Sequence, residues 1–226
     1  MAVIHHTTLT PTKLELVAAW LPSRPWYRGG TSGPELSKAG GFRLDDPEGE
    51  VGIEFMVVTD APADAPADAP ADAPAGEPAA YLVPLTYRGA PLDGAEDALV
   101  GTMEHGVLGR RWAYDGCHDP VLVGRLLALL EGRTEAQAQS DSDTPDRDVT
   151  RALTGGPVAG PATATDTDGG TVLTLATGAT LHLNRVLTPA GDLPPTATGH
   201  VSGVYRPTPV TTAATVFAVL IPAPAS

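Results

Sequence analysis

Residues 99–132 read LVGTMEHGVLGRRWAYDGCHDPVLVGRLLALLEG, and this stretch decides the fold. Its second half predicts a helix from Asp119 to Gly132. Asp119 is a good N-cap because its carboxylate accepts from the free N–H groups of the first turn, and Pro120 costs nothing at the first helical position. Gly132 suits the left-handed conformation that ends many helices. The apolar residues between them recur at helical spacing and form one stripe: Leu122, Val123, Leu126, Leu127, Leu129 and Leu130.

The first half of the stretch predicts a strand that leads into this helix. Arg110, Trp112 and Tyr114 would share one face of that strand, and Arg111 would share the other with Ala113. The Asp-Gly pair that follows is a turn signal. We therefore expect a strand, a tight corner and then a helix whose leucine stripe packs onto the sheet that carries Trp112.

The composition excludes several classes of partner. The 226 residues include 14 lysines and arginines against 27 aspartates and glutamates, which gives a net charge of −13. An acidic chain without a basic stripe argues against nucleic acid and against anionic membrane surfaces. The single cysteine, Cys117, excludes an intrachain disulfide and suits a reducing compartment. The N-terminus has no cationic region before a long apolar run, so we expect no signal peptide and a cytoplasmic protein.

A short strand and a short helix are expected near the N-terminus. Residues 2–9 alternate as a strand does. Thr12 and Glu15 have the spacing of a capping box, in which the two side chains satisfy each other's backbone N–H groups. The helix that they begin is expected to end at Pro22, because proline cannot continue a helix.

Two longer strands are indicated further along the chain. Residues 51–59 alternate as a strand does, with Val51, Ile53, Phe55 and Val57 on one face. Glu54 belongs to the other face and is expected to face solvent on the outer side of the sheet. Residues 81–88 alternate in the same way. Pro84 lies in the middle of this second strand and indicates an edge strand or a bulge, because proline cannot donate to a neighbouring strand.

A low-complexity insert separates these two strands. The tetrapeptide Asp-Ala-Pro-Ala occurs four times between Asp60 and Ala75. Each proline removes a hydrogen-bond donor and favours extended backbone, and the aspartates repel one another. We therefore expect residues 60–79 to form a disordered or extended surface loop. Such an insert is tolerated because the entropy of loop closure grows only slowly with length.

The whole chain is expected to fold as an α+β protein. We predict a curved, mostly antiparallel sheet of about seven or eight strands packed on two helices. Residues 1–132 would form the first domain and the polar residues 133–148 a linker. Residues 149–226 would be a β-rich extension that completes or extends the sheet. Within this extension Thr177 and Gly178 indicate the turn of a hairpin.

Several short pieces of this sequence occur together in one known family. They are Trp20-Leu21-Pro22, Arg24-Pro25-Trp26-Tyr27, Tyr81-Leu82-Val83-Pro84-Leu85-Thr86-Tyr87-Arg88, and Tyr114-Asp115-Gly116 followed by Asp119-Pro120. The first 132 residues thereby resemble the N-terminal cap domain of the bacterial maltokinase family, of the actinobacterial type. The resemblance implies a cystatin-like topology, a curved antiparallel sheet wrapped around a helix. In that family the cap precedes a kinase of the aminoglycoside-phosphotransferase type, which phosphorylates maltose with ATP and Mg²⁺.

The kinase activity of that family is not carried over to this chain. Phosphoryl transfer needs a positioned hydroxyl and a neutralised phosphate, and the family's kinase part supplies them with a base aspartate in an HGD-like loop and a metal-binding aspartate. The sequence contains no His-Gly-Asp, and too few residues follow Gly132 for two kinase lobes. We therefore interpret the chain as a free-standing relative of the cap.

Two groups of residues are candidates for ligand binding. Aromatic faces stack on sugar rings and arginine forks bind hydroxyls or phosphates, so a Trp/Arg cluster could form a sugar platform. The alternative is that the rings are the core of a domain with few aromatic residues. Glu104 and His105 could act as an acid/base pair, or they could end a strand with ordinary ion pairs. The candidate residues are Trp26, Tyr27, Arg28, Glu104, His105, Arg110, Arg111 and Trp112.

No metal, cofactor or catalytic residue is predicted. Cys117-His118-Asp119 and His5-His6 contain metal-ligand residue types but lack the spacing of a zinc site. Residues 29–33 are rich in glycine, yet no Gly-Lys-Ser/Thr follows, so they do not form a P-loop. No Gly-x-Ser-x-Gly nucleophile motif occurs either.

Three functions remain open at this point. The leading hypothesis is a non-catalytic accessory protein that associates with a kinase or with an enzyme of maltose, trehalose or α-glucan (glycogen) metabolism. The second is a carbohydrate-binding module that uses the Trp/Arg cluster. The third is an unrecognised enzyme of α-glucan metabolism.

Overall fold

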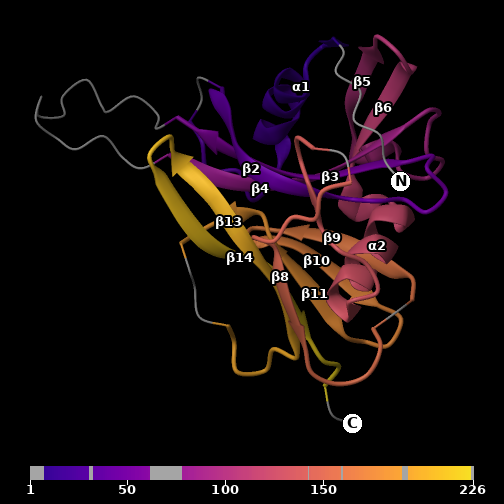
Figure 1. The fold of residues 1–226 in the computed structure, drawn as a ribbon, viewed down its shortest axis with the longest axis vertical. Coiled ribbons are helices and arrows are strands. Elements are labelled where there is room, and N and C mark those ends of the chain that lie inside the picture. Colours follow the sequence, from indigo (N-terminus) through magenta and orange to yellow (C-terminus); the bar gives the residue numbers. More distant parts are fainter. Residues whose placement is uncertain are drawn as a thin grey trace, which may run out of the picture.

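Within the residues that the structure describes, the chain folds as two curved antiparallel sheets and two α-helices (Figure 1). The computed structural model describes residues 8–30, 33–61, 78–141, 143–158, 160–189 and 193–224. The predicted α+β class is confirmed. The first sheet alone accounts for the expected number of strands, because it has eight, and a second sheet adds six more.

The first sheet is built from the N-terminal part of the chain. The order of its main strands is β1 (Leu9–Thr10), β5 (Leu99–His105), β6 (Gly109–Asp115), β4 (Ala79–Arg88), β3 (Gly52–Asp60), β2 (Leu36–Leu44) and β7 (Gln137–Ala138). The eighth strand, β12 (Val186–Leu187), comes from much later in the chain and pairs with one end of β4. Each named pairing in this sheet is antiparallel.

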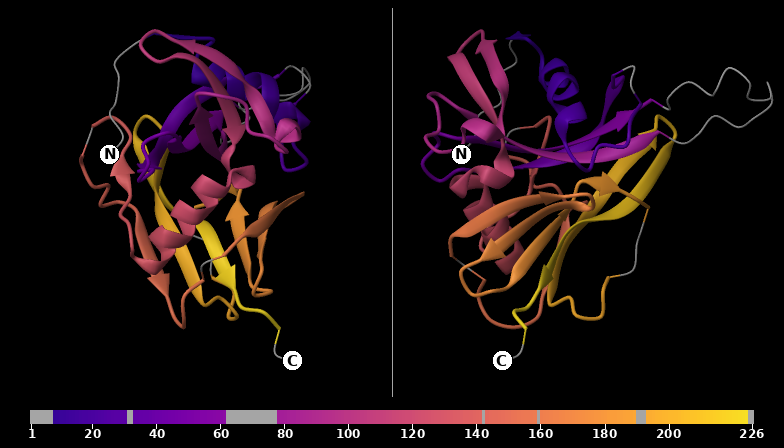
Figure 2. Two further views of the ribbon diagram at one scale, coloured as in Figure 1. Left: turned by 90° about the vertical axis from the view of Figure 1, so that its right-hand side faces the viewer. Right: turned by 180° about the vertical axis from the view of Figure 1, so that it is seen from behind.

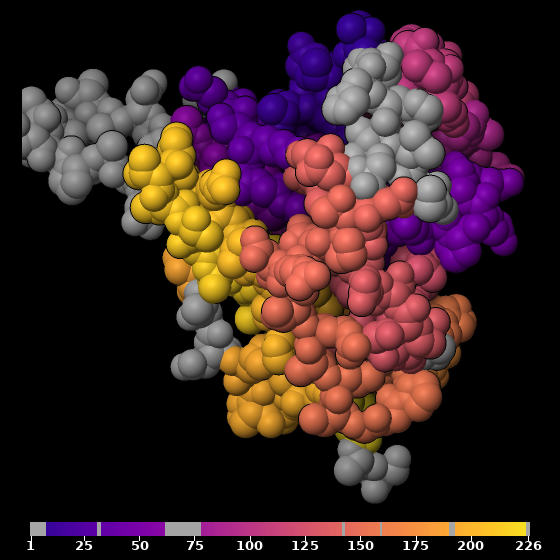
Figure 3. Space-filling view, viewed as in Figure 1, coloured from indigo at the N-terminus to yellow at the C-terminus, as the bar shows by residue number. Residues whose placement is uncertain are grey.

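The second sheet is built from the C-terminal part of the chain. Its order is β8 (Thr150–Leu153), β13 (Gly199–Thr208), β14 (Thr211–Ile221), β11 (Thr180–Asn184), β10 (Gly170–Leu175) and β9 (Ala162–Thr167). The predicted hairpin turn at Thr177 and Gly178 is confirmed, since it joins β10 to β11. Figures 2 and 3 show that the tip of the β13–β14 hairpin reaches up beside the first sheet. Gly40 on β2 lies against Tyr205 on β13 at this meeting point.

The helix α2 (Pro120–Glu131) begins and ends as its sequence predicts. The carboxylate of Asp119 accepts from the N–H of Val121 at 2.9 Å, and Gly132 adopts the left-handed conformation with a φ of 75°. Its leucine stripe is buried. A short 3₁₀ turn, η3 (Gly116–His118), forms the corner between β6 and α2.

One apolar core joins α2 to both sheets. It contains Leu126 and Leu130 of α2 together with buried residues of both sheets. Phe42 of β2 stacks on Phe55 of β3 at 4.5 Å between ring centroids, and it also contacts Phe217 of β14. The division into residues 1–132, 133–148 and 149–226 stays a prediction. Strand pairing nevertheless crosses each of its boundaries, through β7 and through β12.

The helix α1 (Lys13–Trp20) covers the opposite face of the first sheet. Its predicted capping box is present, since the Thr12 N–H donates to the Glu15 carboxylate at 2.7 Å and the Glu15 N–H donates to the Thr12 hydroxyl. The helix is followed by a 3₁₀ turn, η1 (Leu21–Ser23), which contains the expected terminating proline. Val17 and Trp20 pack with residues of β3 and β4 in a second apolar cluster. A third short 3₁₀ turn, η2 (Glu96–Ala98), precedes β5.

The expectation that Pro84 marks an edge strand or a bulge is wrong. β4 is an interior strand, and its register with β3 is regular through the pair of Pro84 with Phe55. On its other side β4 is shared by two short partners. β12 pairs with residues 80–81 and β6 with residues 85–88. The Leu82 N–H donates to this side, so the nitrogen of Pro84, two residues further on, faces the gap between the partners, where no donor is needed.

The insert and the N-terminal strand fall only partly within the described residues. Asp60 and Ala79, the two ends of the expected loop, are strand residues that pair with each other. Residues 62–77 lie outside the described part of the chain. The strand expected at residues 2–9 is described only from residue 8 onward, where β1 pairs with β5.

Candidate functional site

The β5–β6 hairpin separates the candidate residues of its two strands. Glu104 pairs with Arg110 across the hairpin, and the Arg110 guanidinium lies 5.4 Å from the ring of Trp112 on the same face. His105 and Arg111 belong to the other face, where both line a cleft. Alternation along the two strands therefore divides the predicted cluster between opposite faces of the hairpin.

Trp26, Tyr27 and Arg28 lie elsewhere, in the segment after α1, where Trp26 and Tyr27 belong to the apolar cluster on the α1 face of the first sheet. Trp26 has no exposed surface, and the Tyr27 hydroxyl donates to Asp60 at 3.0 Å. Burial and the Asp60 carboxylate raise the pKa of Tyr27 to about 12. The backbone N–H of Arg28 donates to the Tyr81 hydroxyl at 3.0 Å. These contacts fix the segment after α1 against β3 and β4, and they do not bring it to the hairpin.

The cleft that includes His105 and Arg111 has a volume of about 410 Å³. It lies at the end of the first sheet that α1 leaves uncovered, between the N-terminus of α1, the β2–β3 turn and the β5–β6 hairpin. We call it the hairpin cleft. Its lining combines apolar side chains, such as Ile53, Met103 and Leu108, with several charged ones.

Glu54 forms the polar floor of the hairpin cleft. Its carboxylate accepts from Lys13 Nζ at 2.5 Å, from the Tyr87 hydroxyl at 2.9 Å and from Gln139 Nε2 at 3.0 Å. The expectation that Glu54 faces solvent is wrong, because its residue is only 5% exposed. Burial by itself raises the pKa of Glu54, but the Lys13 charge and the hydrogen bonds from Lys13 and Tyr87 outweigh it, so the pKa is lowered.

Arg111 and His105 form the hairpin side of the cleft. Among the described residues, the buried Nε of Arg111 has no hydrogen-bond partner. Its guanidinium lies so close to Gly89 that a Cβ there would come within 2.6 Å of Nη1. The Nδ1 of His105 accepts from the N–H groups of Val107 and Leu108, at 3.2 and 3.1 Å. These bonds hold the His105 ring against the tip of the hairpin.

The region that holds this hairpin is similar to a known family. Residues 20–119 match the maltokinase N-terminal cap domain. We call this part of the chain the cap. The match confirms the resemblance seen in the sequence, and it runs from the end of α1 to the N-cap of α2. No curated protein matches the chain.

The cap and the second sheet are joined by a buried ion pair. Arg185, between β11 and β12, donates from Nη2 to both carboxylate oxygens of Asp115 at 2.6 Å and from Nε to the Thr171 hydroxyl at 2.8 Å. Its guanidinium also lies 5.1 Å from the ring of Trp26. Burial lowers the pKa of Arg185, but the Asp115 charge outweighs it, and the net effect raises the pKa. Sequence reasoning missed Arg185, because no local pattern marks a single arginine within a β-rich tail.

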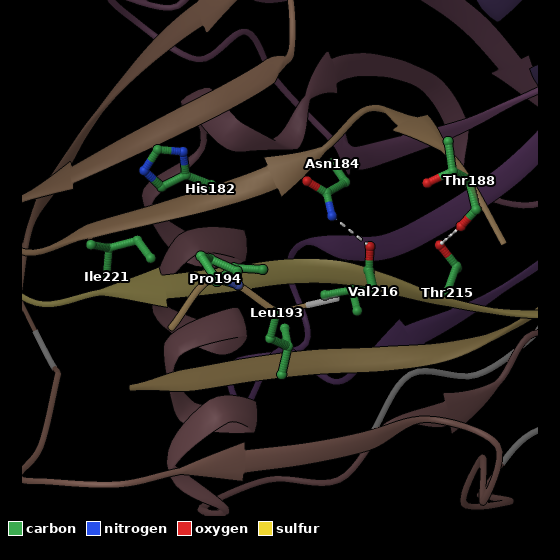
Figure 4. A pocket seen from close by; sticks show the side chains of 9 residues that line it. His182, Asn184, Thr188, Leu193, Pro194, Thr215, Val216 and Ile221 are labelled. Atoms are coloured by element: carbon green, nitrogen blue, oxygen red, sulfur yellow. Dashed lines mark hydrogen bonds between the residues drawn. The ribbon is translucent and has the colours of Figure 1, made fainter. Parts of the chain in front are cut away.

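A second hollow lies away from the cap, on the outer face of the second sheet. It has a volume of about 290 Å³ and is lined by residues of β11 and β14 (Figure 4). Its polar side chains already bond to neighbouring groups. The Asn184 amide donates to the carbonyl of Val216 at 2.8 Å, and the Thr215 hydroxyl donates to the carbonyl of Thr188 at 2.8 Å. This hollow therefore offers a ligand fewer uncommitted polar groups than the hairpin cleft does.

Metal clusters and membrane-spanning helices are both absent from the described ranges. Within them, no group of three or more His, Cys, Asp or Glu side chains is arranged to hold a metal ion. No helix in the same ranges has the length and apolar character to cross a membrane.

Proposed function

We propose that this chain is an accessory protein whose cap associates with a maltokinase-type kinase supplied outside these residues. It would serve maltose, trehalose or α-glucan (glycogen) metabolism in the cytoplasm and would not itself transfer phosphate. The family match of residues 20–119 supports the link to such a kinase. The lone buried Cys117 is compatible with a reducing compartment.

The second sheet is the observation that carries this proposal. In the family that the sequence resembles, the cap precedes a kinase. Here the residues after α2 instead build the second antiparallel sheet, which shares one apolar core with the cap. The Asp115–Arg185 ion pair adds a polar link between the two. The cap is therefore packed against a β-sheet at the point of the chain where the kinase would begin.

The buried aspartates of the described residues support a structural role. Phosphoryl transfer needs aspartates that are available to a hydroxyl and to Mg²⁺. Asp46 accepts from the backbone N–H groups of its own turn, and Asp60 accepts from Tyr27 and from the Glu35 N–H. Asp119 caps α2 and also accepts two bonds of 2.7 Å from Arg88. Each of these carboxylates stabilises the fold.

The tip of the β5–β6 hairpin is a suitable contact surface for the kinase. Val107 is 62% exposed and Leu108 is 44% exposed, although both side chains are apolar. The hairpin rises from the first sheet on the side away from the second sheet (Figure 1). Apolar side chains at such a position gain free energy when a partner covers them.

The experiment is affinity capture with the tagged protein, followed by mass spectrometry. We expect the wild-type chain to enrich a maltokinase-type kinase or another α-glucan enzyme, and Val107→Asp combined with Leu108→Asp to lose it. Val210→Asp is the matched control, because Val210 is 92% exposed in the turn between β13 and β14. Equal recovery of that enzyme by all three proteins would place the contact elsewhere. Failure of the wild-type chain to enrich such an enzyme would contradict the proposal.

The alternative function, a carbohydrate-binding module based on the Trp/Arg cluster, has less support. A sugar platform needs an accessible aromatic face. Trp26 is fully buried, and the Arg110 guanidinium lies over the Trp112 ring. Retardation of the protein in affinity electrophoresis through a glucan gel, lost on Trp112→Ala, would favour this alternative.

A further inference from the structure

We propose that the hairpin cleft binds a small organic anion. Its carboxylate or phosphate group would bond to Arg111, and its carbon skeleton would lie against the apolar part of the lining. The proposal goes beyond the association with a kinase and does not depend on it.

The size and lining of the cleft suit a small organic molecule. Its volume of about 410 Å³ falls within the range of ligand pockets. Leu9, Ile53, Met103 and Leu108 supply apolar surface from strands β1, β3 and β5 and from the hairpin tip. A pocket with mostly apolar walls and a few convergent polar groups is the usual form of such a site.

The negative charges of the buried acidic side chains in the lining are compensated by neighbouring protein groups, so they do not exclude an anion. Glu54 is neutralised by Lys13 and accepts two further bonds, from Tyr87 and Gln139. The Asp46 carboxylate accepts from the backbone N–H groups of Glu48, Glu50 and Val51. The remaining acidic residue, Glu50, is exposed. Buried negative charge in the cleft is therefore already compensated by protein groups.

Two basic side chains of the lining have no acidic partner among the described residues that balances their charge. Arg43 donates to the carbonyl oxygens of Ala138 and Asp141, which carry no charge. Arg111 has no ion pair within the described residues, and its buried Nε has no acceptor there. A buried donor without an acceptor costs free energy, and a guanidinium matches the two oxygens of a carboxylate or phosphate. An anion in the cleft would balance the charge of Arg111 and accept from its guanidinium.

His105 lines the same side of the cleft as Arg111. Its Nδ1 accepts from the N–H groups of Val107 and Leu108, which holds the ring against the hairpin tip. Arg111 therefore supplies the charged donor that an oxyanion needs, and His105 shapes the cleft beside it.

The test is isothermal titration with four probes of related structure. Glucose 1-phosphate and glucuronate carry a phosphate and a carboxylate on one skeleton, glucose carries no charge, and inorganic phosphate has no skeleton. We expect one of the two sugar anions to bind at least about tenfold more tightly than glucose and inorganic phosphate, and to bind less tightly as salt is added. Which of the two binds identifies the anionic group. Equal binding of glucose, or no binding of either sugar anion at millimolar concentration, would overturn the proposal.

Variants of the hairpin assign the binding to Arg111. Arg111→Gln should weaken the binding of the preferred anion at least about tenfold, and Arg111→Lys should weaken it less, because the charge remains without the fork. Arg110→Gln is the matched control, since it removes an equal charge from the opposite face and should change binding less than about twofold. An equal loss in Arg110→Gln, or no loss in Arg111→Gln, would contradict the site. If Arg111→Gln fails to fold, the comparison of Arg111→Lys with Arg110→Lys decides.

Discussion

Arg185 Nη2 lies 2.6 Å from both carboxylate oxygens of Asp115, and both side chains are almost completely buried. Asp115 is the last residue of β6 in the first sheet. Arg185 lies between β11 of the second sheet and β12, which pairs with β4 of the first sheet. The pair therefore lies where the chain crosses between its two sheets. A buried pair of this kind makes the two sheets depend on each other, because either charge alone would be left unpaired in the core.

Removal of one member of this pair should be costly. We expect Arg185→Met to lower the free energy of unfolding by about 3–5 kcal/mol, because Asp115 would remain as an uncompensated buried charge. Combining it with Asp115→Asn should recover part of this loss. Arg133→Met is the control, since the Arg133 side chain is 56% exposed and its partner Glu131 still accepts from the Val158 N–H, so the change should cost about 0–1 kcal/mol. Urea melts measure all four proteins, and similar costs for Arg185→Met and Arg133→Met would contradict the role of the pair.

The leucine stripe of α2 gives a second prediction. Leu126 is buried in the core shared by the two sheets, so Leu126→Ala should cost about 2–5 kcal/mol through lost transfer free energy and a cavity. Gly124 is exposed on the same helix, and a Cβ there meets no atom within 4 Å. Gly124→Ala should therefore be neutral or stabilising by up to about 1 kcal/mol. Denaturant melts check both values. If the two variants had equal stability, the helix would not be docked through its leucine face.

Local signals explain which parts of the fold were predictable. The cap of α2 at Asp119 and its end at Gly132 depend on residues within one turn of the helix, and both were predicted. The same holds for the capping box of Thr12 and Glu15. Arg125 shows the limit even within α2. It lies outside the leucine stripe in the sequence, yet it is partly buried and donates to the Thr134 hydroxyl at 2.6 Å.

Features that depend on distant residues were not predictable. Alternation placed Glu54 opposite the core face of β3, but only the packing of α1 brings Lys13 over it. Pro84 is tolerated in an interior strand because β6 and β12 leave a gap between them. The grouping of Arg111 with Glu54 in one cleft likewise depends on how the hairpin folds over the sheet. A single sequence indicates the helices and strands well. Contacts between elements that are far apart in the chain leave no periodic signal in it.

Glu54 gives a pH-dependent prediction. Its folded-state pKa is lowered relative to the ordinary glutamate value of about 4.3, so its ionised form stabilises the fold above that pH. The contribution is lost as the pH falls through the folded-state pKa. Glu54→Gln should therefore cost about 1–3 kcal/mol at neutral pH, and the difference from wild type should shrink below about pH 4. Glu50→Gln, at an exposed position of the same cleft, is the control. Urea melts that give a difference independent of pH would contradict this assignment.

The Asp-Ala-Pro-Ala insert gives a fourth prediction. Asp60 and Ala79 pair at the ends of β3 and β4, so the two strands already hold their register at this end. Replacing residues 62–77 with a short Gly/Ser turn should move the thermal midpoint by no more than about 2–4 °C, because loop closure depends weakly on length. Asp60→Ala should lower it further, since Asp60 accepts from Tyr27 and from the Glu35 N–H. Scanning calorimetry compares the variants, and a larger loss from the loop replacement would mean that the insert packs on the fold.

The central proposal is that this chain, whose residues 20–119 match the maltokinase cap, does not itself transfer phosphate, and an assay of ADP release tests it most directly. The purified protein is incubated with maltose, ATP and Mg²⁺, and ADP is measured against a blank without protein. The account predicts no maltose-dependent ADP above background, because the second sheet comes after the cap and the buried aspartates stabilise the fold. Maltose-dependent turnover that copurifies with the chain through several columns would contradict it.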